Sequence, residues 1–171
     1  MRTPDGLVVG RGLPSILLRV AIFVVGLAIV LVPLLEGTTL GTVVVLVPAV
    51  LASVYAPASP APAGVVVVVA LLVALADGDP LRAEVLVLIP LVHLFHVTCA
   101  IAGVVPSDGR VHVSALRTPA LRFVLVQAVV FALAGLAALL PAGRVPVAFE
   151  VVGLAGLAGI GLLLIWLQRA K

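Results

Sequence analysis

His93, His96 and Cys99 recur at every third position within an otherwise apolar segment that runs from Val85 to Val105. Imidazole and thiolate groups are ligands that suit zinc or copper. At about 100° per residue, however, the three side chains spread over about 120° of one helix, so other helices would have to complete a ligand shell. The other apolar segments contain no further His or Cys. Two histidines one turn apart on one helix also cannot provide both axial ligands of a single haem.

The same histidines could belong to a proton relay, but no Asp, Glu or Lys lies deep in any other apolar segment. Gln127, in the fifth apolar segment, lies roughly 12 Å from the beginning of its predicted helix at Pro119. His96 lies roughly 13.5 Å from the end of its predicted helix at Val105. We therefore interpret both histidines as neutral side chains that hydrogen-bond between helices. We expect His96 to reach Gln127 or a backbone carbonyl, with His93 turned into the bundle. Cys99 is interpreted as a small buried apolar side chain, and no catalytic residue, metal or cofactor is predicted.

The elements that hold these residues are six stretches of almost purely apolar sequence. Hydrophobic side chains make up 64% of the 171 residues and charged ones only 10%, too few to solvate the surface of a water-soluble domain. A lone strand cannot satisfy its backbone in lipid, so even the valine runs are predicted to be helical. The chain is therefore predicted to be an all-α, polytopic integral membrane helix bundle, a single transmembrane domain over residues 1–171. The six predicted spans are residues 14–35, 40–56, 62–76, 83–105, 119–141 and 146–167.

Prolines mark the predicted beginnings of the helices. Pro14 opens the first span, because an early helical position has no amide donor to lose. Asp79 reads as an N-cap with Pro80 as the first helical residue before the fourth span, and Thr118 with Pro119 repeats the pattern for the fifth.

The segments 40–56 and 62–76 leave two arrangements open. Ala63–Ala76 would be roughly 21 Å long as a helix, short for a full span, and Pro48 lies near the middle of its neighbour. Either both segments cross the membrane, which gives six spans, or they form a re-entrant hairpin, which leaves four. Both arrangements place every charged segment on the same side, so charge does not separate them.

Basic residues predict the orientation. With the N-terminus inside, eight of the ten Lys and Arg residues lie on the cytoplasmic side, and only Arg82 and Arg144 lie outside. This asymmetry predicts that both termini and the segment 107–118 are cytoplasmic in a multi-pass protein of the cell (inner) membrane. Nine arginines against one lysine, with abundant Ala, Val, Gly and Pro, suit a GC-rich bacterial genome.

Two further sets of residues predict contacts with lipid headgroups and with other helices rather than chemistry. Arg110, Arg117 and Arg122 can contact anionic lipid headgroups at ~1 kcal/mol each, and the absence of interleaved aromatic residues argues against nucleic acid as a partner. Small residues in the sixth predicted span follow a helix-packing pattern, in which the partner is either the fifth span or another protein, including a second copy. These small residues are Gly153, Ala155, Gly156 and Gly159.

Three functional hypotheses of different classes follow. The first is a non-enzymatic accessory or scaffold subunit of a membrane complex, because the chain has neither an extramembrane domain nor a catalytic motif. The second is a small transporter or channel-like protein with a polar path at His93, His96 and Gln127. The third is a membrane metal or redox protein centred on His93, His96 and Cys99. Substrate, partner and oligomeric state are not encoded in any recognisable motif.

Overall fold

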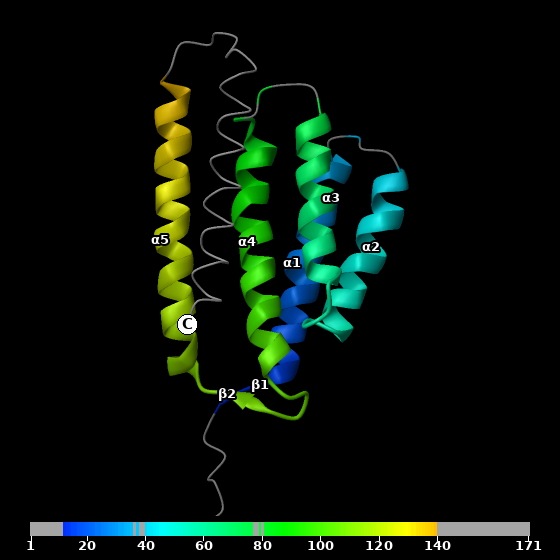
Figure 1. Ribbon diagram of the computed structural model, residues 1–171, viewed down its shortest axis with the longest axis vertical. Helices are drawn as coiled ribbons and strands as arrows, with labels where there is room; N and C mark the ends of the chain where they lie inside the picture. Colours follow the sequence, from blue (N-terminus) through cyan, green and yellow to red (C-terminus); the bar gives the residue numbers. More distant parts are fainter. Residues whose placement is uncertain (1–11, 36, 38–39, 77–78, 80, 140–171) are drawn as a thin grey trace, which may run out of the picture. The chain divides into compact units, whose positions relative to one another are not determined.

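Helices dominate the part of the chain that the computed structural model describes, residues 12–35, 37, 40–76, 79 and 81–139 (Figure 1). Its elements are β1 (Leu13–Pro14), α1 (Ser15–Leu35), α2 (Leu40–Tyr55), α3 (Ala61–Leu75), α4 (Ala83–Val104), β2 (Arg110–Val111) and α5 (Val113–Ala138). The all-α prediction is confirmed. The predicted sixth span and its packing residues Gly153, Ala155, Gly156 and Gly159 lie outside the described residues.

Three of the described helices are long and apolar enough to cross a membrane: α1, α4 and α5, with 21, 22 and 26 residues. The apolar helices α2 and α3 have 16 and 15 residues, below the roughly 20 that a 30 Å hydrocarbon core requires. The chain is thus compatible with a helical membrane protein. The count of six spans stays a prediction.

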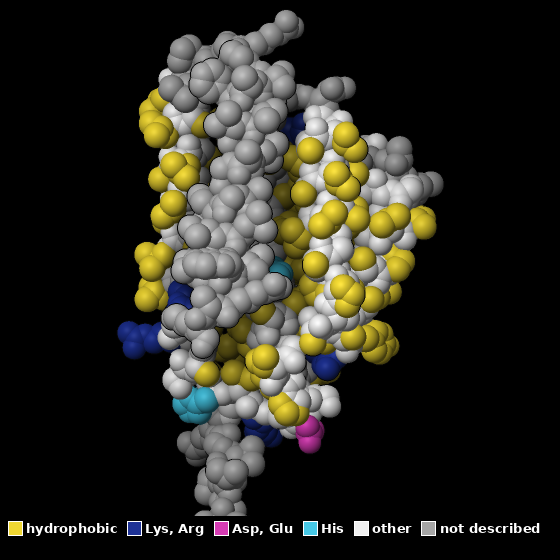
Figure 2. Space-filling view, viewed as in Figure 1, with side chains coloured by type: hydrophobic (Ala, Val, Ile, Leu, Met, Phe, Trp, Pro, Cys, Tyr) yellow, Lys and Arg dark blue, Asp and Glu magenta, His cyan; other side chains and the backbone are white. Residues whose placement is uncertain are grey.

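The chain divides into two compact units, Met1–Gly135 and Leu136–Lys171. The first unit contains α1–α4, both strands and most of α5. In that unit α1 packs against α4 and α2, α2 packs against α3, and α3 packs against α4. Ile22, Ile29, Leu46, Val65 and Phe95 are fully buried where these helices meet. Apolar side chains cover the visible faces of α2 and α3 (Figure 2). Such extended apolar surface is what lipid, rather than water, accommodates.

A short antiparallel ladder between β1 and β2 joins the beginning of α1 to the segment after α4. Leu13 pairs with Val111, and Pro14 pairs with Arg110. Beside the ladder, the Ser15 amide donates to the Gly109 carbonyl at 3.1 Å, and the Ser15 hydroxyl donates to the carbonyl of Ser107. Pro14 therefore ends a strand, and α1 begins one residue after the position predicted from the sequence.

The predicted N-cap at Asp79 is wrong. Its carboxylate accepts a hydrogen bond from the Leu81 amide at 2.8 Å, and its carbonyl accepts one from the Arg82 amide at 3.2 Å. These bonds close a turn that precedes the helix, and Arg82 occupies the N-cap position of α4. An Asp side chain can satisfy a turn in the same way as a helix end, which is why the sequence pattern alone misassigned it.

The predicted beginning of the fifth helix at Thr118-Pro119 is also wrong, because α5 begins at Val113. His112 accepts from the Ala115 amide through its carbonyl at 2.9 Å, and its Nδ1 atom lies 2.7 Å from Ser114 Oγ. These contacts stabilise the first turn of α5, so the helix begins six residues before Pro119. Pro119 then lies inside it and removes only the amide that would have paired with the Ala115 carbonyl.

The turn between α2 and α3 lies beside the ends of α1 and α4 that are near the β ladder. Arg19 donates from Nη1 to the carbonyls of Val54 and Tyr55, at 2.6 and 2.9 Å. A Cβ atom added at Gly103 would lie 3.3 Å from Ala58 Cβ, so the turn also approaches the last residues of α4 closely. Each of the two short helices therefore runs alongside most of the length of the longer ones (Figure 1).

Candidate functional site

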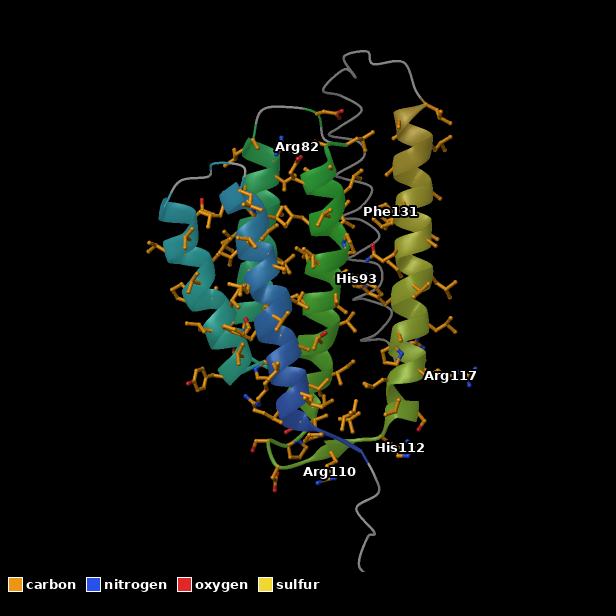
Figure 3. The ribbon with its side chains drawn as sticks, turned by 180° about the vertical axis from the view of Figure 1, so that it is seen from behind. Arg82, His93, Arg110, His112, Arg117 and Phe131 are labelled. Atoms are coloured by element: carbon orange, nitrogen blue, oxygen red, sulfur yellow. The ribbon has the colours of Figure 1, made fainter. Side chains whose placement is uncertain are left out.

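Two polar side chains from the middle of α4 and α5, His93 and Gln127, meet between these helices. Gln127 Nε2 lies 2.7 Å from His93 Nδ1. The rings of His93 and Phe123 also face each other, with centroids 4.9 Å apart and planes inclined by 43°. Phe123 and Gln127 are four residues apart, so they lie on one face of α5 and hold the same imidazole. Figure 3 shows His93 on the side of α4 toward α5.

The predicted hydrogen bond of His96, to Gln127 or to a backbone carbonyl, is wrong, since Gln127 pairs with His93. The error follows from the misplaced beginning of α5. Starting the helix six residues earlier moves Gln127 about 9 Å deeper, so the matching position on α4 shifts from His96 in the direction of His93. His96 is exposed, and within the described part of the chain it makes no hydrogen bond.

Gln127 is buried, with 8% of its surface exposed, and its Oε1 atom has no hydrogen-bond partner among the described residues. Exchanging the amide nitrogen and oxygen would only move the vacancy, because one of the two amide groups stays unpaired in either orientation. An unpaired buried amide group costs about 1–3 kcal/mol. The amide is therefore held in place by its contact with His93 rather than by a saturated network.

The second ring nitrogen of His93, Nε2, contacts no polar group among the described residues. When the Gln127 amide donates to Nδ1, the neutral imidazole carries its proton on Nε2 and presents a donor there. With the amide reversed, Nδ1 donates and Nε2 becomes an acceptor. The amide thus sets the tautomer of His93, and through it the hydrogen-bonding character of the free edge of the ring.

A groove of about 740 Å³ lies between α3 and α4, next to this pair. Among the described residues that line it, only His93 and His96 are polar. The other lining residues are Ala63, Val66, Val67, Val69, Ala70, Val73 and Ala74 of α3 and Val85, Leu88, Ile89 and Val92 of α4. The small side chains of Ala63, Ala70 and Ala74 leave space on the α3 side of the groove.

Cys99 is enclosed in the helix core. It is 1% exposed and packs in the apolar core with Phe95 and Ala102, as predicted for a buried apolar side chain. His93, by contrast, faces α5 and the groove. No three His, Cys, Asp or Glu side chains among the described residues are grouped so that they could hold a metal ion.

The predicted headgroup-contact residues Arg110, Arg117 and Arg122 all have exposed side chains. Figure 3 shows Arg110, His112 and Arg117 near one end of the helices and Arg82 near the other. The Nε atom of Arg82 lies 4.0 Å from a carboxylate oxygen of Glu84. Arg110 and Arg117 therefore lie at the end of the helices opposite Arg82.

Two structural features were not predicted from the sequence. One is the contact of the Arg19 guanidinium with the last carbonyls of α2. The other is the groove, whose only sequence signal is the set of alanines on one face of α3. The chain matches no protein-family model, no curated protein and no solved structure.

Proposed function

We propose that this chain is a non-enzymatic, multi-pass protein of a bacterial cell membrane and serves as an accessory or scaffold subunit of a membrane complex. The observation that carries the proposal is the surface of α5. Within this helix, all of which is described, Gln127 is the one buried side chain. Large apolar residues such as Leu121, Val124 and Val129 are more than half exposed. A long apolar helix with so little buried surface offers a face to another membrane protein.

The test is purification from the native membrane in a mild detergent, with identification of the proteins that co-elute. Val124→Trp places a bulky side chain on the exposed face of α5 and should reduce the recovery of the partner. Val44→Trp changes a valine on α2 that is also more than half exposed, and it should leave recovery unchanged. A single monomeric species without any co-eluting protein, for the unaltered chain and both variants, would contradict the scaffold proposal. Co-elution of a second copy alone would limit it to self-association.

We further propose that α2 and α3 both cross the membrane, so that the chain has six spans with both termini in the cytoplasm. Their turn lies beside Gly103, the second-last residue of α4, and near Arg19 in the second turn of α1. This position supports a turn at a membrane face rather than a hairpin tip in the middle of the bilayer. A cysteine at Ser59 in a Cys99→Ala background should react with an impermeant thiol reagent from the cytoplasm. Reaction from the outside alone would support the re-entrant hairpin.

A small transporter or channel-like protein is the second candidate, and the contact between His93 and Gln127 favours it. This contact places two polar side chains from different helices 2.7 Å apart, next to a groove that His96 also lines. Proteoliposomes that enclose a pH-sensitive dye would report proton movement. We expect Gln127→Leu to abolish any protein-dependent flux, whereas Val44→Trp should not affect it. The same rate in liposomes with and without the protein would contradict a proton path.

A further inference from the structure

The groove between α3 and α4 has the size and the lining of a small-molecule site. Its volume of about 740 Å³ falls within the range of roughly 300–1,000 Å³ typical of ligand pockets. Such pockets combine a mostly apolar lining with a few polar groups that orient the ligand. Here the two histidines are those polar groups, and the side chains of α3 form an apolar wall.

The lining restricts the charge of an occupant. No Asp, Glu, Lys or Arg occurs among the described residues that line the groove. An ionised ligand would therefore lose its hydration without gaining an opposite charge, which is strongly unfavourable in an apolar environment. The occupant that fits is neutral.

The depth of the histidines excludes an ordinary phospholipid as the molecule that satisfies them. His93 is the eleventh of the 22 residues of α4, so it lies about 15–17 Å from either end of the helix. Phospholipid headgroups lie at the membrane faces, and acyl chains carry no hydrogen-bonding group at this depth. A molecule that pairs with the histidines must carry a polar atom into the middle of the hydrocarbon region.

The ring nitrogens of His93 and His96 that lack a described partner indicate which polar group the ligand carries. His93 has one ring nitrogen without a described partner, and His96 makes no hydrogen bond within the described residues. Each neutral imidazole offers one donor and one acceptor nitrogen, and residues three apart on a helix are neighbours on its surface. A hydroxyl group can donate to one ring and accept from the other, whereas a carbonyl can only accept.

From these observations we infer that the groove binds a neutral, membrane-soluble alcohol, with its hydroxyl between His93 and His96 and its apolar body along α3. Gln127 acts as a positioning residue, because it holds the His93 ring through Nδ1 and leaves Nε2 toward the ligand. The inference does not depend on the scaffold function, since a subunit of a complex and a transporter could both use such a site.

The test is photocrosslinking of the purified full-length protein in nanodiscs with 1-hexadecanol that carries a diazirine next to the hydroxyl-bearing carbon. We expect saturable labelling of peptides from residues 61–104, displaced by unlabelled 1-hexadecanol. His96→Leu removes one hydrogen-bonding ring from an exposed position and should weaken competition about tenfold, the equivalent of one hydrogen bond. His96→Gln keeps a donor and an acceptor and should retain most of the binding.

Ala70→Phe should block labelling by filling the groove, while Ala132→Phe, at an exposed alanine of α5, is the matched control and should leave labelling intact. A hexadecane diazirine of the same length should label without saturation. Equal, saturable labelling by the alkane would overturn recognition of a polar group. Stronger labelling by the corresponding ketone would overturn the assignment of a hydroxyl. Labelling that neither Ala70→Phe nor His96→Leu alters would overturn the site itself.

Discussion

Replacing Gly26 by alanine tests the closest packing in the helix core. Gly26 is buried in α1, and a Cβ atom added there would overlap Val50 Cγ1 of α2. The same atom would lie 3.1 Å from Val50 Cγ2 and 3.2 Å from Phe95 Cε2 of α4. Val50 is 4% exposed and Phe95 is fully buried, so neither neighbour can simply swing out of the bundle.

The expected magnitude follows from two opposing effects. Overpacking a filled core by one methyl group typically costs about 1–3 kcal/mol. Alanine is a better helix former than glycine by up to about 1 kcal/mol, which offsets part of this loss. A cavity of about 30 Å³ next to Val50 offers its side chain a little room, but a β-branched residue in a helix strongly prefers one χ1 rotamer. We therefore expect Gly26→Ala to lower the free energy of unfolding by about 1–2 kcal/mol.

The assay is reversible unfolding in mixed micelles with increasing SDS, followed by far-ultraviolet circular dichroism. Gly64→Ala and Gly135→Ala are matched controls, because an added Cβ atom meets nothing within 4 Å at either helical position. Both controls should be neutral or slightly stabilising. Combining Gly26→Ala with Val50→Ala should recover about 1 kcal/mol relative to the sum of the single effects, as expected for side chains in contact. Equal stability of Gly26→Ala and Gly64→Ala would refute the packing described for α1, α2 and α4.

Three further outcomes are expected. His93→Leu should destabilise the protein by about 1–3 kcal/mol in the same SDS titration, because it removes the interhelical contact and leaves the buried Gln127 amide without its partner. His96, which is exposed and makes no hydrogen bond among the described residues, should tolerate change to leucine, and the reverse ranking would contradict the observed pairing. Arg19→Gln should destabilise by about 1 kcal/mol and increase proteolysis at the α2–α3 turn, because the last carbonyls of α2 lose a charged donor; a protease-resistant turn would argue against this role. A cysteine at Asp79, in the Cys99→Ala background, should react with impermeant reagent from outside only, and reaction from the cytoplasm alone would reverse the proposed orientation.

Much of the fold could be predicted from the sequence because it depends on local composition. Uniformly apolar segments of this length can be stable only as helices in lipid, so α1, α2, α3 and α4 begin and end within one or two residues of the predicted spans. Pro62 is an example of a reliable local signal, since it lies in the first turn of α3, where a missing amide donor removes no hydrogen bond. The burial of Cys99 followed from its side chain in the same way.

The arrangement around the candidate site was decided by the tertiary structure. Helices that are apolar on every side carry almost no signal for their rotation about the axis, so the sequence could not tell which face of α4 meets α5. The local bonds of His112 and Ser114 moved the beginning of α5, and this shift moved the partner of Gln127 from His96 to His93. The groove between α3 and α4 and the contact of Arg19 with the end of α2 likewise depend on how closely separate helices pack. Hydrophobicity predicts that each apolar segment is helical, whereas side-chain fit between segments determines which polar residues meet.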